Sequence, residues 1–179
     1  MKVVLIPEDQ YVIPKELLYC LILTLAIAIQ YVATAYAFTF RARTQVFTRK
    51  FMEQFKAEHI AAFPGKKHAP EFGYPDSGNG YYGKKLPYAD WFKMNNGQRC
   101  QLNFLEHLNF IVVGTMIAAF YYPVWALALQ CFIFVGRLAY SIGYTVYGPS
   151  GRLIGAIIMD LAIFATFGLM VASCFKLMN

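Results

Sequence analysis

Four long apolar segments, separated by short or polar stretches, constrain this chain more than any other feature. They run from Leu17 to Phe40, from Leu102 to Tyr122, from Val124 to Tyr147 and from Leu153 to Phe175. Each has about the 20 residues that an α-helix needs to cross roughly 30 Å of hydrocarbon. Helices of soluble proteins carry a polar face, which these segments mostly lack. The sequence therefore predicts an all-α integral membrane protein, a four-helix bundle with four transmembrane helices in antiparallel, up-and-down order.

The composition agrees with this prediction and excludes an ordinary soluble domain. Only 15% of the residues are charged, whereas soluble domains carry roughly 25%. The 179 residues are enough for one compact domain, so we expect a single membrane domain over residues 1–179. The first apolar segment is longer than the roughly 7–15 residues of a signal-peptide core, and we expect it to be retained as a helix.

A long polar segment, residues 41–99, separates the first two apolar segments, and we expect it to be a loop. It carries eleven Lys or Arg residues against five Asp or Glu residues. Four spans place both termini on the opposite side, where the only basic residues are Lys2, Lys15 and Lys176. The positive-inside rule therefore predicts that the loop lies on the cytoplasmic side, or on the matrix side of a mitochondrial membrane.

The net charge of +6 comes mostly from this loop. It favours contact with membrane lipids and with anionic substrates, and no nucleic-acid-binding motif accompanies it. Residues 78–83 are a formal match to G-x-G-x-x-G. A dinucleotide site needs a strand before this motif and a helix after it. The motif stands instead among Pro75, Asp76, Ser77 and Lys84, so we expect an ordinary loop.

The four cysteines, Cys20, Cys100, Cys131 and Cys174, lie in or beside separate apolar segments. None is spaced as C-x-x-C, and the sequence predicts no metal site and no redox pair. We expect each to be a small buried hydrophobic residue.

Charged and polar side chains form a first stripe where the second apolar segment begins. Arg99, Asn103 and Glu106 are spaced i, i+4 and i+7, which places them within about 60° of one another on a helix. Ionisable groups at membrane depth are costly, so they are candidates for a functional site. The alternative is structural, because Glu106 and Arg137 could form a buried ion pair whatever the function.

A second stripe lies on the third apolar segment, where Arg137, Tyr140 and Tyr144 are spaced i, i+3 and i+7. Arg152 follows just after the next turn. Guanidinium groups bind carboxylates with paired hydrogen bonds, and a carboxylate with an amide can hold an ammonium group. The two stripes together suit a small zwitterionic ligand with several carboxylates, and glutathione has this charge pattern. Tyrosines at helical spacing are also common as an interfacial belt or packing surface.

Two sequence motifs resemble those of the MAPEG superfamily, the membrane-embedded glutathione transferases and leukotriene C synthases. Residues 95–106 resemble the signature of the second helix, in which Asn follows Arg by four positions and Glu by seven. Residues 136–144 resemble the second signature, in which Arg is followed by Tyr three positions on and then by Gly-Tyr. The segment from Gly148 to Arg152 is similar to microsomal glutathione transferases of the third type.

This resemblance implies a homotrimer in which glutathione, as co-substrate, lies in a U shape between neighbouring subunits. It implies that glutathione is held by Arg99, Gln101, Asn103, Glu106, Arg137, Tyr140 and Tyr144. In the leukotriene synthase type, an Arg after the third span stabilises the glutathione thiolate. Gly151 aligns with that Arg without a gap, and Arg152 is the candidate beside it. The implied substrates are lipid electrophiles such as epoxides, or lipid hydroperoxides, which reach the site from the bilayer.

Two hypotheses of function remain open at this point. The first is a glutathione transferase with glutathione peroxidase activity, in the endoplasmic reticulum or a mitochondrial membrane. The second is a non-catalytic subunit with the same fold in a larger hetero-oligomeric complex, for example a mitochondrial respiratory assembly. The long first loop favours the second hypothesis, as does Asp160, an acidic residue in the fourth segment that could contact another helix or a protein partner.

Overall fold

A computed structural model describes residues 14–178 of the chain, and Lys2 lies outside this range. Four long helices account for most of the described residues. Helix α1 (Lys15–Thr34) continues through a π-helical turn (Ala35–Phe40) into α2 (Arg41–Val46), so that Lys15–Val46 is one helix. The others are α5 (Tyr88–Ala119), α6 (Pro123–Tyr147) and α7 (Leu153–Met178). All four are long and apolar enough to cross a membrane, and residues 14–178 contain no strand.

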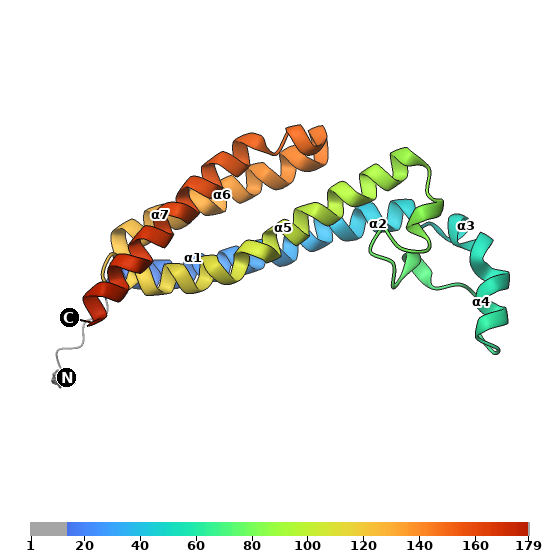
Figure 1. Cartoon of the computed structure of the whole chain (residues 1–179), viewed down its shortest axis with the longest axis horizontal. Coiled ribbons are helices and arrows are strands. Elements are labelled where there is room, and N and C mark those ends of the chain that lie inside the picture. The colour runs from blue at the N-terminus through green and yellow to red at the C-terminus, as the bar shows by residue number, and fades with distance from the viewer. Residues whose placement is uncertain (1–13, 179) are drawn as a thin grey trace.

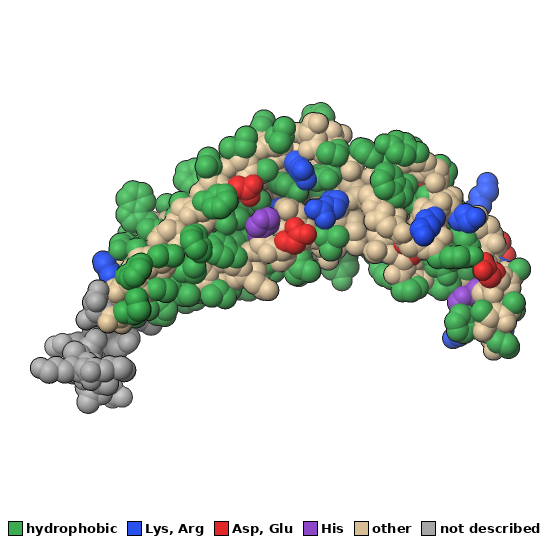
Figure 2. Space-filling model, viewed as in Figure 1, with side chains coloured by type: hydrophobic (Ala, Val, Ile, Leu, Met, Phe, Trp, Pro, Cys, Tyr) green, Lys and Arg blue, Asp and Glu red, His purple; other side chains and the backbone are tan. Residues whose placement is uncertain are grey.

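The four helices form an antiparallel bundle, as the sequence predicted (Figure 1). The start of α1 and the end of α7 lie at the same end of this bundle (Figure 1). Many large apolar side chains point outward, among them Leu25 on α1, Phe132 on α6 and Phe164 on α7. Figure 2 shows the resulting hydrophobic surface along the bundle. An apolar exterior of this kind suits hydrocarbon as its solvent, and the protein is an integral membrane protein.

Apolar packing and close backbone approaches hold the helices together. Ile27, Phe104, Ile111, Ile133 and Met159 form the centre of the core, with contributions from all four helices. Between α6 and α7 the packing is closest, because glycines from both helices face each other there. A Cβ atom added at Gly136 would lie 2.9 Å from the backbone N of Met159. Small residues at helix contacts are typical of membrane bundles, where close packing replaces the hydrophobic effect.

Polar contacts add to the packing between α1 and α6. Gln130 Nε2 donates a hydrogen bond of 2.7 Å to Thr24 Oγ1, and Gln30 Nε2 donates one of 3.1 Å to the backbone oxygen of Phe134. Hydrogen bonds between helices in a membrane typically contribute about 0.6–2 kcal/mol each.

The polar segment is shorter than predicted, and this boundary is corrected by the structure. Residues 41–46 extend the first helix, and residues 88–99 begin α5, so that only residues 47–87 connect them. The polar start of α5 is helical because it packs on the first helix. A Cβ at Gly97 would lie 2.8 Å from the Phe38 carbonyl oxygen, so the two backbones nearly touch.

The connecting segment is itself packed and has its own small core. It includes α3 (Arg49–Met52) and α4 (Lys56–Ala62), joined by a 3-10 turn. Phe47, Met52 and Phe55 are buried, and they pack with Val46 of α2 and Met94 of α5. We call residues 47–87 the loop module. In Figure 1 it lies at the end of the paired α2 and α5 helices, away from the α6–α7 hairpin.

The prediction that all four cysteines are buried was wrong for two of them. Cys20 and Cys100 are buried, but Cys131 and Cys174 are exposed. These two point away from the bundle, because α6 and α7 each turn one face outward.

Candidate functional site

Arg137 is the centre of the candidate site, on the α5–α6 side of the bundle. Its side chain is completely buried. Arg137 Nη1 donates a hydrogen bond of 2.8 Å to Asn103 Oδ1 on α5. The guanidinium carbon lies 4.4 Å from the centre of the Phe104 ring and 4.9 Å from that of Tyr140. Aromatic faces attract cations, so these rings hold the guanidinium in place without occupying its hydrogen-bond donors.

Two of the guanidinium nitrogens of Arg137, Nε and Nη2, have no hydrogen-bond partner among residues 14–178. These atoms form one edge of the group, which matches a carboxylate with two parallel hydrogen bonds. A buried donor without a partner typically costs about 1–3 kcal/mol. Such a group in a native fold needs an explanation, and an absent ligand or water is one.

Tyr140 and Tyr144 extend the site along α6. Their rings lie 5.7 Å apart, and both residues are buried. The Tyr140 hydroxyl makes no well-formed hydrogen bond in the described part of the chain, and the Arg152 guanidinium lies close to it. The guanidinium carbon of Arg152, in the turn before α7, lies 5.3 Å from the centre of the Tyr144 ring. The structure thus connects Arg137, Tyr140, Tyr144 and Arg152 in one continuous series.

Arg99 and Glu106 occupy the exposed part of the same α5 face. Arg99 Nη1 lies 3.9 Å from Glu106 Oε1, and about half of each side chain is exposed. Glu106 therefore pairs with Arg99, and no Glu106–Arg137 ion pair forms in the structure. An exposed pair at this distance contributes little stability, so both groups remain available to a ligand.

Gln101 is the one predicted site residue that the structure places elsewhere. It lies about 200° around the α5 axis from Arg99, on the side that faces the first helix. Its Nε2 is 3.4 Å from the Tyr31 hydroxyl, and it lines a separate cavity with Arg43 and Tyr74. In the protomer, Gln101 makes its hydrogen bond with Tyr31 of the first helix and none with Arg137.

Figure 2 shows acidic, basic and histidine side chains gathered at mid-length on one face of a largely hydrophobic surface. Asp160 on α7 is half-buried and has no ion pair with any residue of the range 14–178. In that range no group of three His, Cys, Asp or Glu residues could hold a metal ion. The cluster combines the guanidinium groups of Arg99, Arg137 and Arg152 with two tyrosines and two carboxylates, which suits a ligand that carries charges of both signs.

The loop module contains a second polar cluster that sequence reasoning missed. Asp76 is buried, and its carboxylate accepts hydrogen bonds of 2.7 Å from the backbone N–H groups of Gly78, Gly80 and Gly83. These are the three glycines of the G-x-G-x-x-G match. Their amides hold a carboxylate of this chain, in the way that such loops elsewhere hold phosphate. The glycine spacing was the available signal, and the anion is Asp76, two residues before the first of these glycines.

Arg43 fastens this cluster to the first helix. Its Nη2 donates a 2.6 Å hydrogen bond to the backbone oxygen of Asp76, and its Nη1 donates one of 3.0 Å to that of Phe72. Burial by itself would raise the pKa of Asp76, but the N–H groups of Gly83, Gly80 and Gly78 outweigh this effect and lower the pKa below its usual value. Asp76 is therefore a charged structural residue at neutral pH.

Comparison with known proteins agrees with this architecture. Residues 17–173 match the model of the MAPEG family. Searches of curated protein sequences and of solved structures found no match. Because the family match covers all four long helices and both polar stripes, the chain belongs to the MAPEG family.

Proposed function

We propose that this protein is a membrane-bound glutathione transferase, with glutathione peroxidase activity, that acts on lipid electrophiles or lipid hydroperoxides. Within the family we propose that it is of the microsomal glutathione transferase 3 type, from the similarity of residues 148–152. The observation that carries the proposal is the buried edge of Arg137, whose Nε and Nη2 have no partner in the described chain. A ligand carboxylate would satisfy both donors.

The residues around Arg137 fit the other groups of glutathione. Glutathione carries two carboxylates, one ammonium group and one thiol. Arg99, exposed on the same side, offers a second guanidinium for the other carboxylate, and Glu106 offers an anion for the ammonium group. The Tyr140 hydroxyl, which has only Arg152 close to it, adds a buried donor. The count and the signs of the charges thus match the ligand.

Arg152 is the candidate for activating the thiol. A cation beside a thiol favours the thiolate and lowers its pKa, and the thiolate is the nucleophile. With a lipid epoxide, the sulfur forms a bond to a ring carbon while the carbon–oxygen bond of the ring breaks. The oxygen then takes a proton from water or from a neighbouring hydroxyl. In the protomer, Arg152 stands beside Tyr144 rather than in the bundle core.

The position of Gln101 supports a site shared between subunits. Gln101 contacts Tyr31 and lines a cavity with Arg43 and Tyr74 in its own protomer. In a homotrimer, each Gln101 could reach glutathione bound to the neighbouring protomer. We therefore propose a homotrimer, in the endoplasmic reticulum or a mitochondrial membrane, with the loop module on the cytoplasmic or matrix side.

The alternative is a non-catalytic MAPEG-fold subunit of a larger hetero-oligomeric complex. It is favoured by the loop module, which has its own buried core and adds a folded surface outside the bundle. Asp160 on α7 has no ion pair in the range 14–178, but its charge lies near Arg137 and Arg152, so it gives this alternative little support. Neither feature explains the unpaired edge of Arg137, and we therefore prefer the enzyme.

Calorimetric titration of glutathione into the full-length protein in mild detergent tests the proposal. Arg99→Ala is the informative variant, because Arg99 is exposed and its removal leaves the core intact. Lys66→Ala, on an exposed part of the loop module, is the matched control. Saturable binding that Arg99→Ala abolishes and Lys66→Ala retains supports the enzyme. If no glutathione binds, the oligomeric state of the same sample is measured by size-exclusion chromatography. A trimer that does not bind glutathione favours the hypothesis of a non-catalytic subunit.

A further inference from the structure

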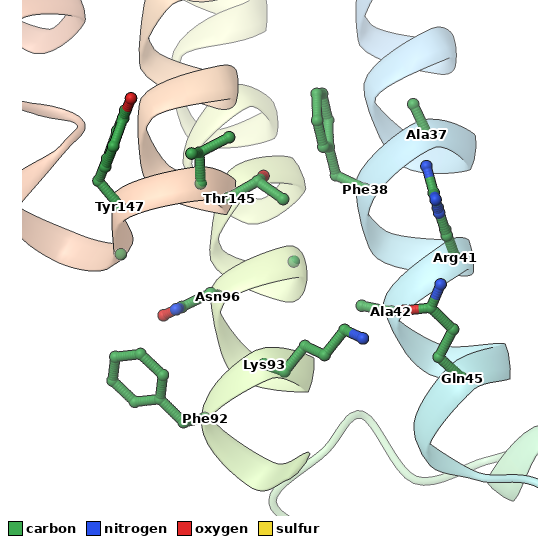
Figure 3. Close-up of a pocket in the computed structure, with 13 residues that line it drawn as sticks. Ala37, Phe38, Arg41, Ala42, Gln45, Phe92, Lys93, Asn96, Thr145 and Tyr147 are labelled. Atoms are coloured by element: carbon green, nitrogen blue, oxygen red, sulfur yellow. The ribbon is translucent and has the colours of Figure 1, made fainter. Parts of the chain in front are cut away.

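A cavity separate from the Arg137 site lies between the first helix, the start of α5 and the end of α6 (Figure 3). It has a volume of about 780 Å³. Its lining residues come from positions 37–45, 92–97 and 145–148. None of the eight proposed glutathione and thiolate residues is among them.

The cavity combines two cations with an apolar wall. Arg41 and Lys93 line it together with Gln45 and Asn96, and no Asp or Glu does. Figure 3 shows Lys93 extending from α5 toward the first helix, where Gln45 lies. Neither Arg41 nor Lys93 has a side-chain ion pair with any residue in the range 14–178. The positive charge is therefore not compensated within the protomer.

Apolar side chains lie on both sides of these cations. Phe38 and Val146 line the part of the wall toward the bundle, whereas Phe92 lies at the end toward the loop module. In Figure 3 Phe38 lies above Arg41 and Gln45, nearer the start of the first helix. A ligand that fills the cavity thus meets the two cations and, toward the bundle, an apolar wall.

The depth of the cavity agrees with the headgroup region of a bilayer. Arg41 lies 26 residues after Lys15 in one unbroken helix, which is about 39 Å at 1.5 Å per residue. A bilayer with its headgroups is roughly 40–45 Å thick. With Lys15 at the opposite surface, Arg41 and the turn at Gly148 lie level with the headgroups of the basic side.

We propose that this cavity binds the headgroup of an anionic phospholipid, with Arg41 and Lys93 on the phosphate and the first part of an acyl chain along Phe38 and Val146. The lipid comes from the leaflet on the side of the loop module. It occupies the space between the first helix and α6, and so connects the α2–α5 extension to the bundle. This site is distinct from the glutathione site and does not depend on it.

Native mass spectrometry of the full-length protein, released from nanodiscs of phosphatidylglycerol and phosphatidylcholine in equal parts, tests this proposal. The wild type is expected to retain phosphatidylglycerol preferentially. Arg41→Gln with Lys93→Gln is expected to weaken its retention about 25-fold, taking roughly fivefold for each cation. Ala37→Trp, at an exposed lining position, fills the cavity without a change of charge and is expected to abolish retention.

Two controls separate this site from general surface charge and from the glutathione site. Lys66→Gln with Lys67→Gln removes two exposed cations elsewhere in the loop module and should retain the lipid. Arg99→Ala should retain it too, whatever its effect on glutathione. Equal retention of both lipids by the wild type would overturn the proposal. So would an equal loss in the Lys66 and Lys67 variant, or displacement by excess inorganic phosphate, which would indicate a site for soluble anions.

Discussion

Asn103 Oδ1 accepts a hydrogen bond of 2.8 Å from Arg137 Nη1, and this contact determines which edge of the guanidinium stays free. With Nη1 occupied by α5, the pair Nε and Nη2 is left to face the site. Phe104 and Tyr140 hold the group from its faces. The fold thus holds a buried arginine in one orientation, with the edge that could pair with a carboxylate left without a partner among residues 14–178.

Replacement of Asn103 by Ala is expected to weaken both folding and binding. Arg137 Nη1 would lose its partner while still buried, which costs about 1–3 kcal/mol of stability. The guanidinium would also be free to turn, so the affinity for glutathione should fall. Thermal unfolding in detergent and calorimetry measure the two effects. If Asn103→Ala binds glutathione as the wild type does, the orienting role of Asn103 is wrong.

Arg137→Lys is expected to keep the positive charge but to weaken the binding of the glutathione carboxylate. An ammonium group is a point charge, and it cannot make two parallel hydrogen bonds to a carboxylate. Hydrogen bonds to charged groups contribute about 1.5–3 kcal/mol, which corresponds to a roughly 10–150-fold loss of glutathione affinity. Arg49→Lys, at an exposed position of α3, is the control and should bind normally. Comparable affinities of the two variants would contradict the assignment.

The four apolar segments could be predicted from the sequence because membrane helices must satisfy every backbone group within themselves. The residues at which these helices begin and end could not be predicted in the same way. The polar start of α5 has no apolar periodicity, and it is helical because Gly97 and Met94 pack on the first helix and on Phe47. Such tertiary packing overrides local composition, and a single sequence does not display it.

The site was predictable to the extent that helical spacing defines a face. Arg99, Asn103 and Glu106 share a face of α5, and Arg137, Tyr140 and Tyr144 share one of α6, as their spacing indicated. Gln101 does not share this face, because two residues of a helix turn about 200°. Its assignment to the site came from the resemblance to the family and not from its spacing. Arg43 was counted only as a loop charge, since nothing in its local sequence shows that Phe72 and Asp76 fold back onto it.

Gly155→Ala is expected to disturb the α6–α7 contact. A Cβ at Gly155 would collide with the backbone of Tyr140, so the helices would have to move apart. Overpacking of this kind typically costs about 1–3 kcal/mol, and it should displace Tyr140 from the site. Gly168→Ala on the same helix is the matched control, because nothing lies within 4 Å of its added Cβ. Thermal unfolding of both variants measures the difference, and equal melting temperatures would contradict the close packing.

Arg152→Gln is expected to affect the reaction more than the binding of glutathione. The residue stands beside Tyr144 and makes no contact with Asn103 or Arg137 in the described structure. Removal of its charge should raise the pKa of bound glutathione thiol and lower kcat at neutral pH, with a smaller change in the glutathione Kd. Ultraviolet absorbance of the thiolate as a function of pH measures the pKa directly. An unchanged thiol pKa would assign thiolate stabilisation to another cation.

Asp76→Asn is expected to loosen the loop module and leave the bundle intact. Asp76 Oδ1 accepts from Gly78 and Gly80, and Oδ2 accepts from Gly83. In the variant, an amide NH2 group would replace one of these oxygens. Its N–H would then point at a backbone N–H group, and no hydrogen bond could form between the two donors. Loss of a buried, charge-assisted hydrogen bond should lower the local stability by about 1–3 kcal/mol. Hydrogen exchange of residues 72–85, followed by mass spectrometry, measures this effect.

The pH dependence of the same exchange provides a second, independent test of Asp76. Its pKa in the folded protein is lowered, since the N–H groups of Gly83, Gly80 and Gly78 outweigh the effect of burial. The unfolded segment therefore takes up a proton first as the pH falls, and the stabilisation is complete at neutral pH and lost only in acid, below the usual carboxyl range. Wild-type exchange, corrected for its intrinsic rate, should accelerate there, whereas Asp76→Asn should show no such transition. Glu71→Gln, which removes an exposed carboxylate of the same module, should behave as the wild type, and an acid transition that persists in Asp76→Asn would assign it to a different group.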